Sequence, residues 1–589
     1  MNEKTNPPIE IERVIRPQNS ASPITAWFAR RGFSIHLGPA SRGLISLLVL
    51  LVFLVPSLAM LFPQRVRPAS ASADQFSSER AMAHLPVIAR EPHPQGSPAQ
   101  NRVRDYLAGQ LADMGLEVEI QRTAGLENVV ARLHGSDPTG AIVILAHYDT
   151  VSDSPGAGDN GSAVAALLEI MHALAAGPAP RNDVIALFDD GEEFPDIYAG
   201  TKAFVRVHPW MSDVRVAISI DTAVAGPIST NEAGPDNGWL VHALARSYTG
   251  GVWTSFSGGG NYNSTPFRNA GILVLALEDN YPYRQKHTGE DQIEIIRPAS
   301  VQQMGEQTLA IARELGGLDL TDPWGEQETF FPVPFLGLAH YPEAWSTPLA
   351  VIAGTLLVLA LGLALWRGFV SWRGLAVAFG TILVTAVLSG TGVNALKPRL
   401  PGLFGWETAR WEEWPEIIPP NGGLAAAGLA LLVLGVAVAG YFLARRWNGR
   451  ADFSLAGLAP YAVPAVALAV SEPRTAYAFI WPVVIGSLGW IGAAVAGKKD
   501  AKWSQDFAIT LAALPLVVIL VPFLPGVVMS DGMKSLEILA VVEVLLLGVI
   551  LPAVDGLFVR LPAQKALQSS SHGFQARSQM SADGVNAGK

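Results

Sequence analysis

The sequence predicts a three-layer α/β domain with a mostly parallel sheet, joined to an N-terminal transmembrane helix and a C-terminal all-α membrane bundle. Three observations lead to this fold class. Half of the 589 residues are hydrophobic and only 16% are charged, which is more apolar than an ordinary soluble protein. The apolar excess lies in one run near the N-terminus and in most of the chain after Pro348. Between these two regions, short apolar runs alternate with helix-like segments.

The first apolar run, residues 43–62, is uncharged and has the length of about 20 residues that a helix needs to cross a bilayer. A cleaved signal peptide is the alternative, because basic residues precede the run and Ala69-Ser70-Ala71 offers a cleavage site. That site lies beyond Arg65 and Arg67, however, and the run is longer than a typical signal core. We therefore expect a transmembrane anchor that follows a cytoplasmic tail at residues 1–42.

Residues 74–345 carry the α/β pattern. Runs rich in Val, Ile and Leu are expected to be strands buried on both faces of a parallel sheet. These runs are residues 141–146, 184–188, 214–220 and 272–277. Helical segments lie between or after them, at residues 162–176, 201–207, 239–247 and 298–315. Such alternation is typical of a three-layer α/β domain.

Residues 348–560 are expected to form a membrane bundle of about seven helices, which makes eight spans with the N-terminal anchor. The expected spans begin near Leu349, Leu375, Leu424, Leu455, Ala476, Phe507 and Leu536. Lys and Arg gather in alternate loops, apart from residues 397–410, and cytoplasmic loops are the ones enriched in these residues. These loops contain Arg367, Arg373, Arg445, Arg446, Arg450, Lys498, Lys499, Lys502, Arg560 and Lys565. We therefore expect a multi-pass protein of the cell membrane, with residues 1–42 and the 561–589 tail in the cytoplasm and the α/β domain outside.

Ionisable residues within the last span are of interest because charge inside a bilayer is costly and often functional. Glu537, Glu543 and Asp555 lie in this span, with Glu543 well inside it. Glu543 is a functional candidate, or else it hydrogen-bonds to a neighbouring helix. The net charge of −10, without a basic stripe, gives no indication of a nucleic-acid partner. Without cysteine, any metal site must use imidazole and carboxylate ligands.

Polar residues follow four of the expected strands at their carboxyl ends, where parallel α/β sheets collect their ligands. These residues are His147, Asp149, Glu192, Glu193, Asp221 and His287, and Asp159 follows in a Gly-Asp-Asn-Gly-Ser motif. That motif alone would be read as a tight turn, and Asp-Gly-Glu-Glu at 190–193 as a charged turn. Two histidines, three carboxylates and a spare glutamate together are what a hydrolase with two metal ions requires. Three further histidines, His172, His208 and His242, have no evident partners and are expected to be structural or on the surface.

Over residues 91–316 these motifs resemble the family of bacterial di-zinc aminopeptidases, which also includes glutamate carboxypeptidases. The resemblance is carried by residues 96–107, by Asn128-Val-Val-Ala-Arg and by residues 147–166. Asp159 follows His147 by 12 residues, and Asp221 follows Glu193 by 28, which agrees with the family. An α/β domain between one helix and a membrane bundle is similar to the multi-pass membrane branch. The resemblance therefore implies a zinc-exopeptidase-like domain.

The resemblance also implies two zinc ions per chain. It assigns one ion to His147 and Asp221, the other to Glu193 and His287, and a bridging role to Asp159. Glu192 would be the general base. Asp149 would accept the other ring N–H of His147 and so orient this ligand.

The sequence departs from the family pattern at two positions. Gly158 stands where the family often has an acid, and Lys286 stands where a tyrosine often precedes the last histidine. The group that stabilises the oxyanion is therefore left open among Lys286, Tyr281 and Tyr283.

The sequence thus predicts a membrane-anchored zinc exopeptidase, in the first place an aminopeptidase, that hydrolyses peptides outside the cytoplasm. A carboxypeptidase or another amidohydrolase would use the same site. A peptide-binding membrane scaffold or transporter without catalysis is the alternative from another class, but such a protein has no need of a general base.

Overall fold

The computed structural model describes residues 38–558, apart from 61, 63–64, 194–196, 256–261, 280, 282, 407–418, 420, 497–500, 523 and 525–532. Nearly all of the two predicted cytoplasmic tails, residues 1–42 and 561–589, lies outside this range. The same holds for Lys498, Lys499, Arg560 and Lys565 of the predicted cytoplasmic segments.

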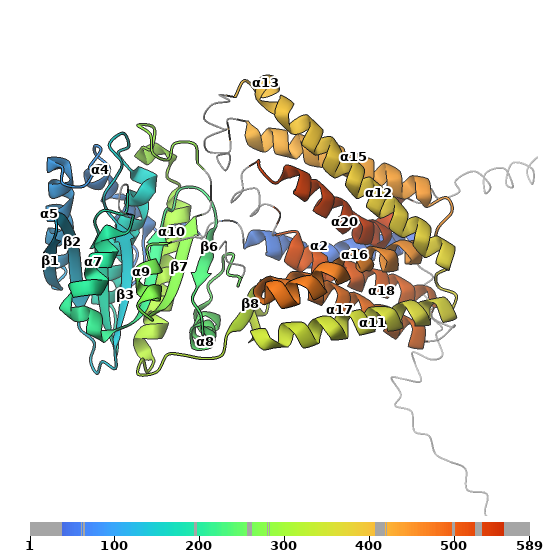
Figure 1. The fold of residues 1–589 in the computed structure, drawn as a ribbon, viewed down its shortest axis with the longest axis horizontal. Coiled ribbons are helices and arrows are strands. Elements are labelled where there is room, and N and C mark those ends of the chain that lie inside the picture. Colours follow the sequence, from blue (N-terminus) through green and yellow to red (C-terminus); the bar gives the residue numbers. More distant parts are fainter. Residues whose placement is uncertain are drawn as a thin grey trace, which may run out of the picture. The chain divides into compact units, whose positions relative to one another are not determined.

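The α/β domain is built on one seven-stranded sheet (Figure 1). Its spatial order is β1 (Glu117–Thr123), β2 (Leu126–Leu133), β4 (Asp183–Asp189), β3 (Ala141–His147), β5 (Val214–Asp221), β7 (Leu273–Asp279) and β6 (Ile228–Ala233). The four central strands β4, β3, β5 and β7 are parallel, whereas β1, β2 and β6 pair antiparallel. The predicted mostly parallel sheet is therefore confirmed.

Alternate residues of the central strands feed two separate hydrophobic cores. On β3, Ile142 and Ile144 point into the core shared with α6 (Ser162–Ala176) and α10 (Pro298–Gly317). The intervening Val143 belongs to the opposite core, with Phe204 of α7 (Ala199–Val207) and Phe267 of α9 (Thr265–Asn269). Full burial of such a side chain stabilises the fold by roughly 1.5–3 kcal/mol. Two cores on one sheet confirm the predicted three layers.

The structure adds strands that the apolar pattern does not predict. β1 and β2 form a hairpin whose turn residues, Ala124 and Gly125, both have positive φ, as a two-residue hairpin turn requires. A second hairpin, β8 (Glu328–Val333) and β9 (Gly337–Pro342), lies between the α/β domain and the membrane helices in the sequence. Strands β1 and β9 are partly exposed, so they lack the continuous apolar runs of a central strand.

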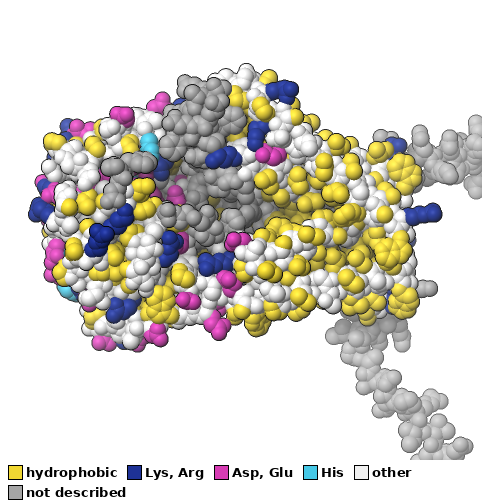
Figure 2. Space-filling model, viewed as in Figure 1, with side chains coloured by type: hydrophobic (Ala, Val, Ile, Leu, Met, Phe, Trp, Pro, Cys, Tyr) yellow, Lys and Arg dark blue, Asp and Glu magenta, His cyan; other side chains and the backbone are white. Residues whose placement is uncertain are grey.

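The described part of the chain contains eight helices that are long and apolar enough to cross a membrane. These are α2 (Pro39–Ala59), α11 (Ser346–Trp366), α12 (Trp372–Leu396), α15 (Gly422–Ala444), α16 (Arg450–Ser471), α17 (Pro473–Val495), α18 (Ala501–Pro515) with the π-helical turn η7 (Leu516–Leu520), and α20 (Leu536–Val554). Hydrophobic side chains cover the surface over the bundle, whereas charged side chains are scattered over the α/β domain (Figure 2). An apolar surface of this extent is expected where helices face lipid.

Two of the three acidic residues in the last span are neutralised by basic partners. Asp555 lies 3.1 Å from the Arg445 guanidinium and also accepts a hydrogen bond from the Tyr441 hydroxyl. Glu537 lies 2.8 Å from the Lys397 ammonium. Glu543, by contrast, makes no hydrogen bond or ion pair with any residue that the structure describes, so the expected bond to a neighbouring helix is not found there.

Candidate metal centre

The five predicted ligands come from different elements but converge at one edge of the sheet. His147 and Asp221 are the last residues of β3 and β5. Glu193 follows β4, and His287 lies in the loop after β7. Asp159 lies in the irregular turn η1 (Ala157–Gly161) that precedes α6. Because parallel strands end at the same edge, their carboxyl ends bring these side chains together.

Three overlapping groups of donor atoms lie at this edge of the sheet: one is His147, Glu192 and Glu193, and the other two share Asp159. Of these two, one is His147, Asp159 and Asp221, and the other is Asp159, Glu193 and His287, each with its donor atoms within 4.8 Å of one another. Oδ1 of Asp159 lies 3.4 Å from Nε2 of His147, and Oδ2 lies 3.0 Å from Nε2 of His287. Each carboxylate oxygen of Asp159 therefore faces a different histidine, which is the arrangement of a carboxylate that bridges two cations.

Two buried atoms of the centre, Nε2 of His147 and Oδ1 of Asp221, have no hydrogen-bond partner within the described chain. Leaving a buried polar atom unpaired costs free energy, and a buried carboxylate costs more. Imidazole nitrogen and carboxylate oxygen are ligands that zinc prefers in the absence of thiolates. The donor set therefore fits divalent cations, zinc in particular.

The electrostatics of the centre also favour cations. Burial, together with the neighbouring carboxylates of Asp221, Asp159 and Glu193, raises the pKa of Glu192 to about 8, although His147 acts to lower it. Burial would lower the pKa of His287, but its contacts with Asp159 and Glu193 raise it to about 9. Both shifts arise because negative charge is crowded into a site that excludes water. Cations placed among these groups would relieve the crowding.

Asp149 contacts both the His147 ring and the loop that carries Glu192 and Glu193. Its carboxylate accepts the backbone N–H groups of Glu192 and Glu193, at 3.1 and 3.2 Å. Nδ1 of His147 lies 3.2 Å from the backbone carbonyl of Asp149 and 3.6 Å from its carboxylate. The carbonyl is thus the nearer acceptor for the His147 ring, while the carboxylate holds the loop that carries the two glutamates.

Three further residues support the centre and were missed by sequence reasoning. Oδ1 of Asn160 accepts the N–H of Thr222 at 3.0 Å, which ties the η1 turn to the end of β5. The Asp291 carboxylate accepts the N–H groups of Gly158 and Asp159 at 2.7 and 3.2 Å. Asp279 accepts N–H groups from the 224–226 turn. The one signal in the sequence was the Asn of the Gly-Asp-Asn-Gly-Ser motif, since the bonds join positions that are distant in the sequence.

Packing explains why glycine stands at position 158. A Cβ atom there would lie 2.7 Å from the Tyr283 hydroxyl oxygen, 2.8 Å from Val224 and 2.9 Å from the Asp291 carboxylate. These distances are shorter than any ordinary contact, so the acid that relatives often have at this position does not fit here.

The three candidates for oxyanion stabilisation lie at different places. Nζ of Lys286 is 3.2 Å from Oδ2 of Asp159, within the centre itself. The Tyr283 side chain is buried, and its hydroxyl has no hydrogen-bond partner in the described chain. Burial and the charges of Asp159 and Asp291 raise the pKa of this hydroxyl well above its ordinary value, so it stays a proton donor. Tyr281 is half-buried and lies two residues before Tyr283 in the same loop.

A cavity of about 740 Å³ lies between this loop and the membrane helices. Tyr281 and Tyr283 line it on the side of the α/β domain, and α12, α15 and α20 line it on the other side. The helical lining is mostly aliphatic, but it includes the carboxyl group of Glu543. Tyr283 therefore separates the metal-binding carboxylates from an apolar cavity.

An α/β domain that collects two histidines and three carboxylates at the carboxyl edge of its sheet has the donor set of a metallohydrolase. Residues 128–312 match peptidase family M28. This match agrees with the resemblance seen in the sequence, and it lies within the part of the chain that carries the candidate metal centre.

The relatives that match the chain are named as proteases or metallopeptidases. The chain is 28% identical over 333 residues to the vacuolar membrane protease of Candida albicans (strain WO-1), covering 52% of this chain and 39% of the relative. It is also 28% identical over 385 residues to endoplasmic reticulum metallopeptidase 1 of Rattus norvegicus, covering 57% and 42%. The chain thus matches less than half the length of these relatives.

Solved structures similar to the α/β domain include BSAP, a zinc aminopeptidase from Bacillus subtilis. It has 15% identity and a TM-score of 0.37, and the match covers 41% of this chain and 95% of that one. A glutaminyl cyclase from Porphyromonas gingivalis has 21% identity and a TM-score of 0.35, over 41% and 99% of the two chains.

Proposed function

We propose that this protein is a membrane-anchored aminopeptidase that uses two zinc ions per chain to hydrolyse peptides outside the cytoplasm. The observation that carries the proposal is the division of the donor atoms into two groups that share Asp159. His147 and Asp221 would hold one ion, and Glu193 and His287 the other. Two such ions would supply Lewis-acid polarisation of the scissile carbonyl and make a water molecule more acidic.

Glu192 is the residue we assign as general base. Its carboxylate lies 3.9 Å from Nε2 of His147, and its side chain is 19% exposed, so substrate and water reach it. It would take the proton of the attacking water and deliver it to the leaving amine. The Asp149 carboxylate holds the backbone of the Glu192 loop in place, which keeps this group beside the ligands. A binding module or transporter would need neither the base nor its support.

A panel of blocked peptides tests the proposal directly. An aminopeptidase should cleave peptides amidated at the C-terminus and leave peptides acetylated at the N-terminus intact. Because the cavity beside Tyr283 is apolar, peptides with an N-terminal Leu or Phe should be cleaved faster than peptides with an N-terminal Glu or Lys. Cleavage of N-acetylated peptides but not of C-amidated peptides would identify a carboxypeptidase on the same site. If unblocked peptides are not cleaved either, the proposal is refuted.

The proposed orientation of the chain in the membrane leads to a second prediction. Reporter fusions after Arg450 and after Lys502 should report the cytoplasm, whereas fusions within residues 74–345 should report the outside. The reason is that Lys and Arg are enriched in alternate loops, and such loops stay on the cytoplasmic side. A cytoplasmic signal from residues 74–345 would reverse the arrangement and make the substrate cytosolic.

The oxyanion donor is tested by a third prediction. We expect Tyr283→Phe to lower kcat and kcat/KM together, because a hydroxyl without a ground-state partner interacts only in the transition state. Loss of one such donor costs roughly 3–4 kcal/mol, or about a hundred- to a thousandfold. Tyr281→Phe is the matched control on the same loop and should have a small effect. A large defect in Lys286→Met with Tyr283→Phe near normal would assign the role to the lysine.

A further inference from the structure

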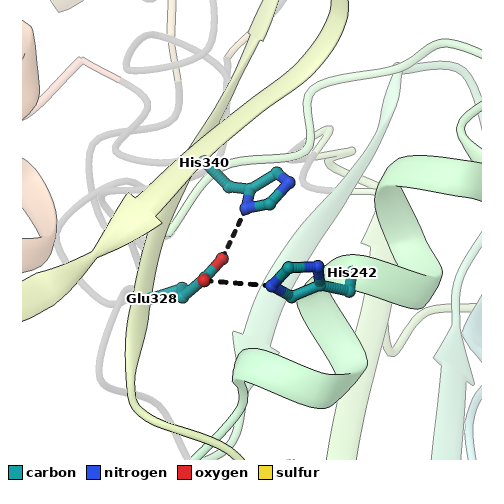
Figure 3. Close-up of side chains that lie close together, drawn as sticks. All are labelled: His242, Glu328 and His340. Atoms are coloured by element: carbon teal, nitrogen blue, oxygen red, sulfur yellow. Dashed lines mark hydrogen bonds and ion pairs between the residues drawn. The ribbon is translucent and has the colours of Figure 1, made fainter.

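A second group of metal-binding side chains lies outside the candidate metal centre, where α8 (Gly238–Ser247) meets the hairpin of β8 and β9. His242 belongs to α8, Glu328 is the first residue of β8, and His340 lies on β9. Figure 3 shows both imidazole rings turned toward the Glu328 carboxylate, each near a different oxygen. One donor atom from each residue lies within 4.8 Å of the others. We propose that His242, Glu328 and His340 form a structural zinc site.

The distances suit a zinc ion after small movements of the side chains. Nδ1 of His340 lies 2.6 Å from Oε2 of Glu328, and Nε2 of His242 lies 3.2 Å from Oε1. Ligand atoms on a tetrahedral zinc ion with bonds of roughly 2.0–2.2 Å are about 3.3–3.5 Å apart. Two histidines and one glutamate are an established ligand set for zinc. The His242 side chain is 54% exposed, so solvent can supply the fourth ligand.

Charge gives a second argument for a cation. The Glu328 side chain is only 9% exposed, and its ion-pair partners within the described chain are these two histidines, without a lysine or arginine. Two neutral imidazoles would leave the buried carboxylate uncompensated. Two protonated imidazoles would repel each other, since their ring centroids are 4.6 Å apart. A zinc ion balances the carboxylate and accepts a lone pair from each neutral ring. A metal-free pair with one protonated ring is the alternative that the experiment must exclude.

The proposed ion would join the α/β domain to the segment that enters the membrane bundle. α8 belongs to the α/β domain, and β9 is followed by the short helix η4 (Glu343–Trp345) and by α11. On β8, the ring of Phe331 stacks on Tyr477 of α17, with centroids 4.3 Å apart. A zinc ion bound at the hairpin would therefore hold the α/β domain and the start of the membrane bundle together. This role is independent of the proposed peptidase function.

Metal analysis of the full-length protein in detergent tests the site. His242→Gln and His340→Gln should each lower the zinc content by one ion per chain relative to wild type. His134→Gln is the matched control, because His134 has one carboxylate partner, Glu117 at 2.8 Å, and no third donor. This control should leave the zinc content unchanged. Zinc contents that are the same in wild type, His242→Gln and His340→Gln would overturn the proposal.

A background without the catalytic centre separates the two kinds of site. His147→Ala combined with Asp159→Ala should keep one zinc ion per chain, and addition of His340→Gln should remove it. X-ray absorption of the double variant should show two imidazole nitrogens and oxygen ligands around this ion. A zinc-free double variant that retains its helical circular dichroism would refute the zinc site at His242, Glu328 and His340 while leaving the peptidase proposal intact. If the double variant fails to fold, the zinc contents of wild type, His242→Gln and His340→Gln still test the site.

Discussion

Asp159→Ala should abolish peptide hydrolysis and remove both of the proposed zinc ions, which is the largest effect that we expect from any single substitution. Asp159 is the one residue common to both donor groups, and its two oxygens face different histidines at 3.4 and 3.0 Å. His147→Ala and His287→Ala should each affect one ion more than the other, because each histidine belongs to a separate group. Zinc content by elemental analysis and kcat on an unblocked peptide are the two measurements.

Asp153→Ala is the control for this prediction. Asp153 is an exposed acid six residues before Asp159 and belongs to neither group of donor atoms, so its loss should change neither zinc nor rate. Chelation of the wild-type protein should reproduce the Asp159→Ala phenotype, and added zinc should restore activity to the wild type alone. An Asp159→Ala protein that retains full zinc content would disprove the bridging role.

Glu192→Gln should reduce kcat by about a hundred- to ten-thousandfold while leaving zinc content unchanged. The amide has the shape of the carboxylate but cannot accept a proton from water. This loss corresponds to roughly 3–5 kcal/mol of transition-state stabilisation. Kinetics and elemental analysis on the same preparation separate a missing base from a missing metal.

Glu290→Gln is the matched control, because Glu290 is exposed and pairs with Arg284 at 3.1 Å outside both donor groups. It should retain near-normal kcat. If Glu192→Gln turns over substrate as fast as wild type, Glu192 is not the base. If the Glu192→Gln protein loses zinc, Glu192 is a metal ligand. The third donor group, His147, Glu192 and Glu193, would support that role.

The central sheet could be predicted because β3, β4, β5 and β7 are buried on both faces and therefore consist of continuous apolar runs. Strands β1 and β9 are partly exposed and carry polar residues, so no such run marks them. The partners of three histidines were also not predicted from the sequence. His172, His208 and His242 were expected to have no partners, and this was wrong, since each lies within 3.5 Å of a carboxylate oxygen. Glu169 lies three residues before His172 on α6, so this pair is visible in the sequence, whereas Glu119 and Glu328 reach His208 and His242 only through the packing of distant elements.

The sequence by itself determined the class of site, because His147, Asp159, Glu193, Asp221 and His287 lie in short motifs with characteristic spacing at the ends of strands. It also determined the apolar spans, because a membrane helix needs a long uninterrupted hydrophobic run. Only the tertiary structure decided which groups support those ligands. Asn160 meets Thr222 across 62 positions, and Asp291 meets Gly158 across 133. Only the tertiary structure brought His242 to Glu328 and His340, because hydrogen bonds and metal ligands act over a few ångströms in space and are indifferent to separation along the chain.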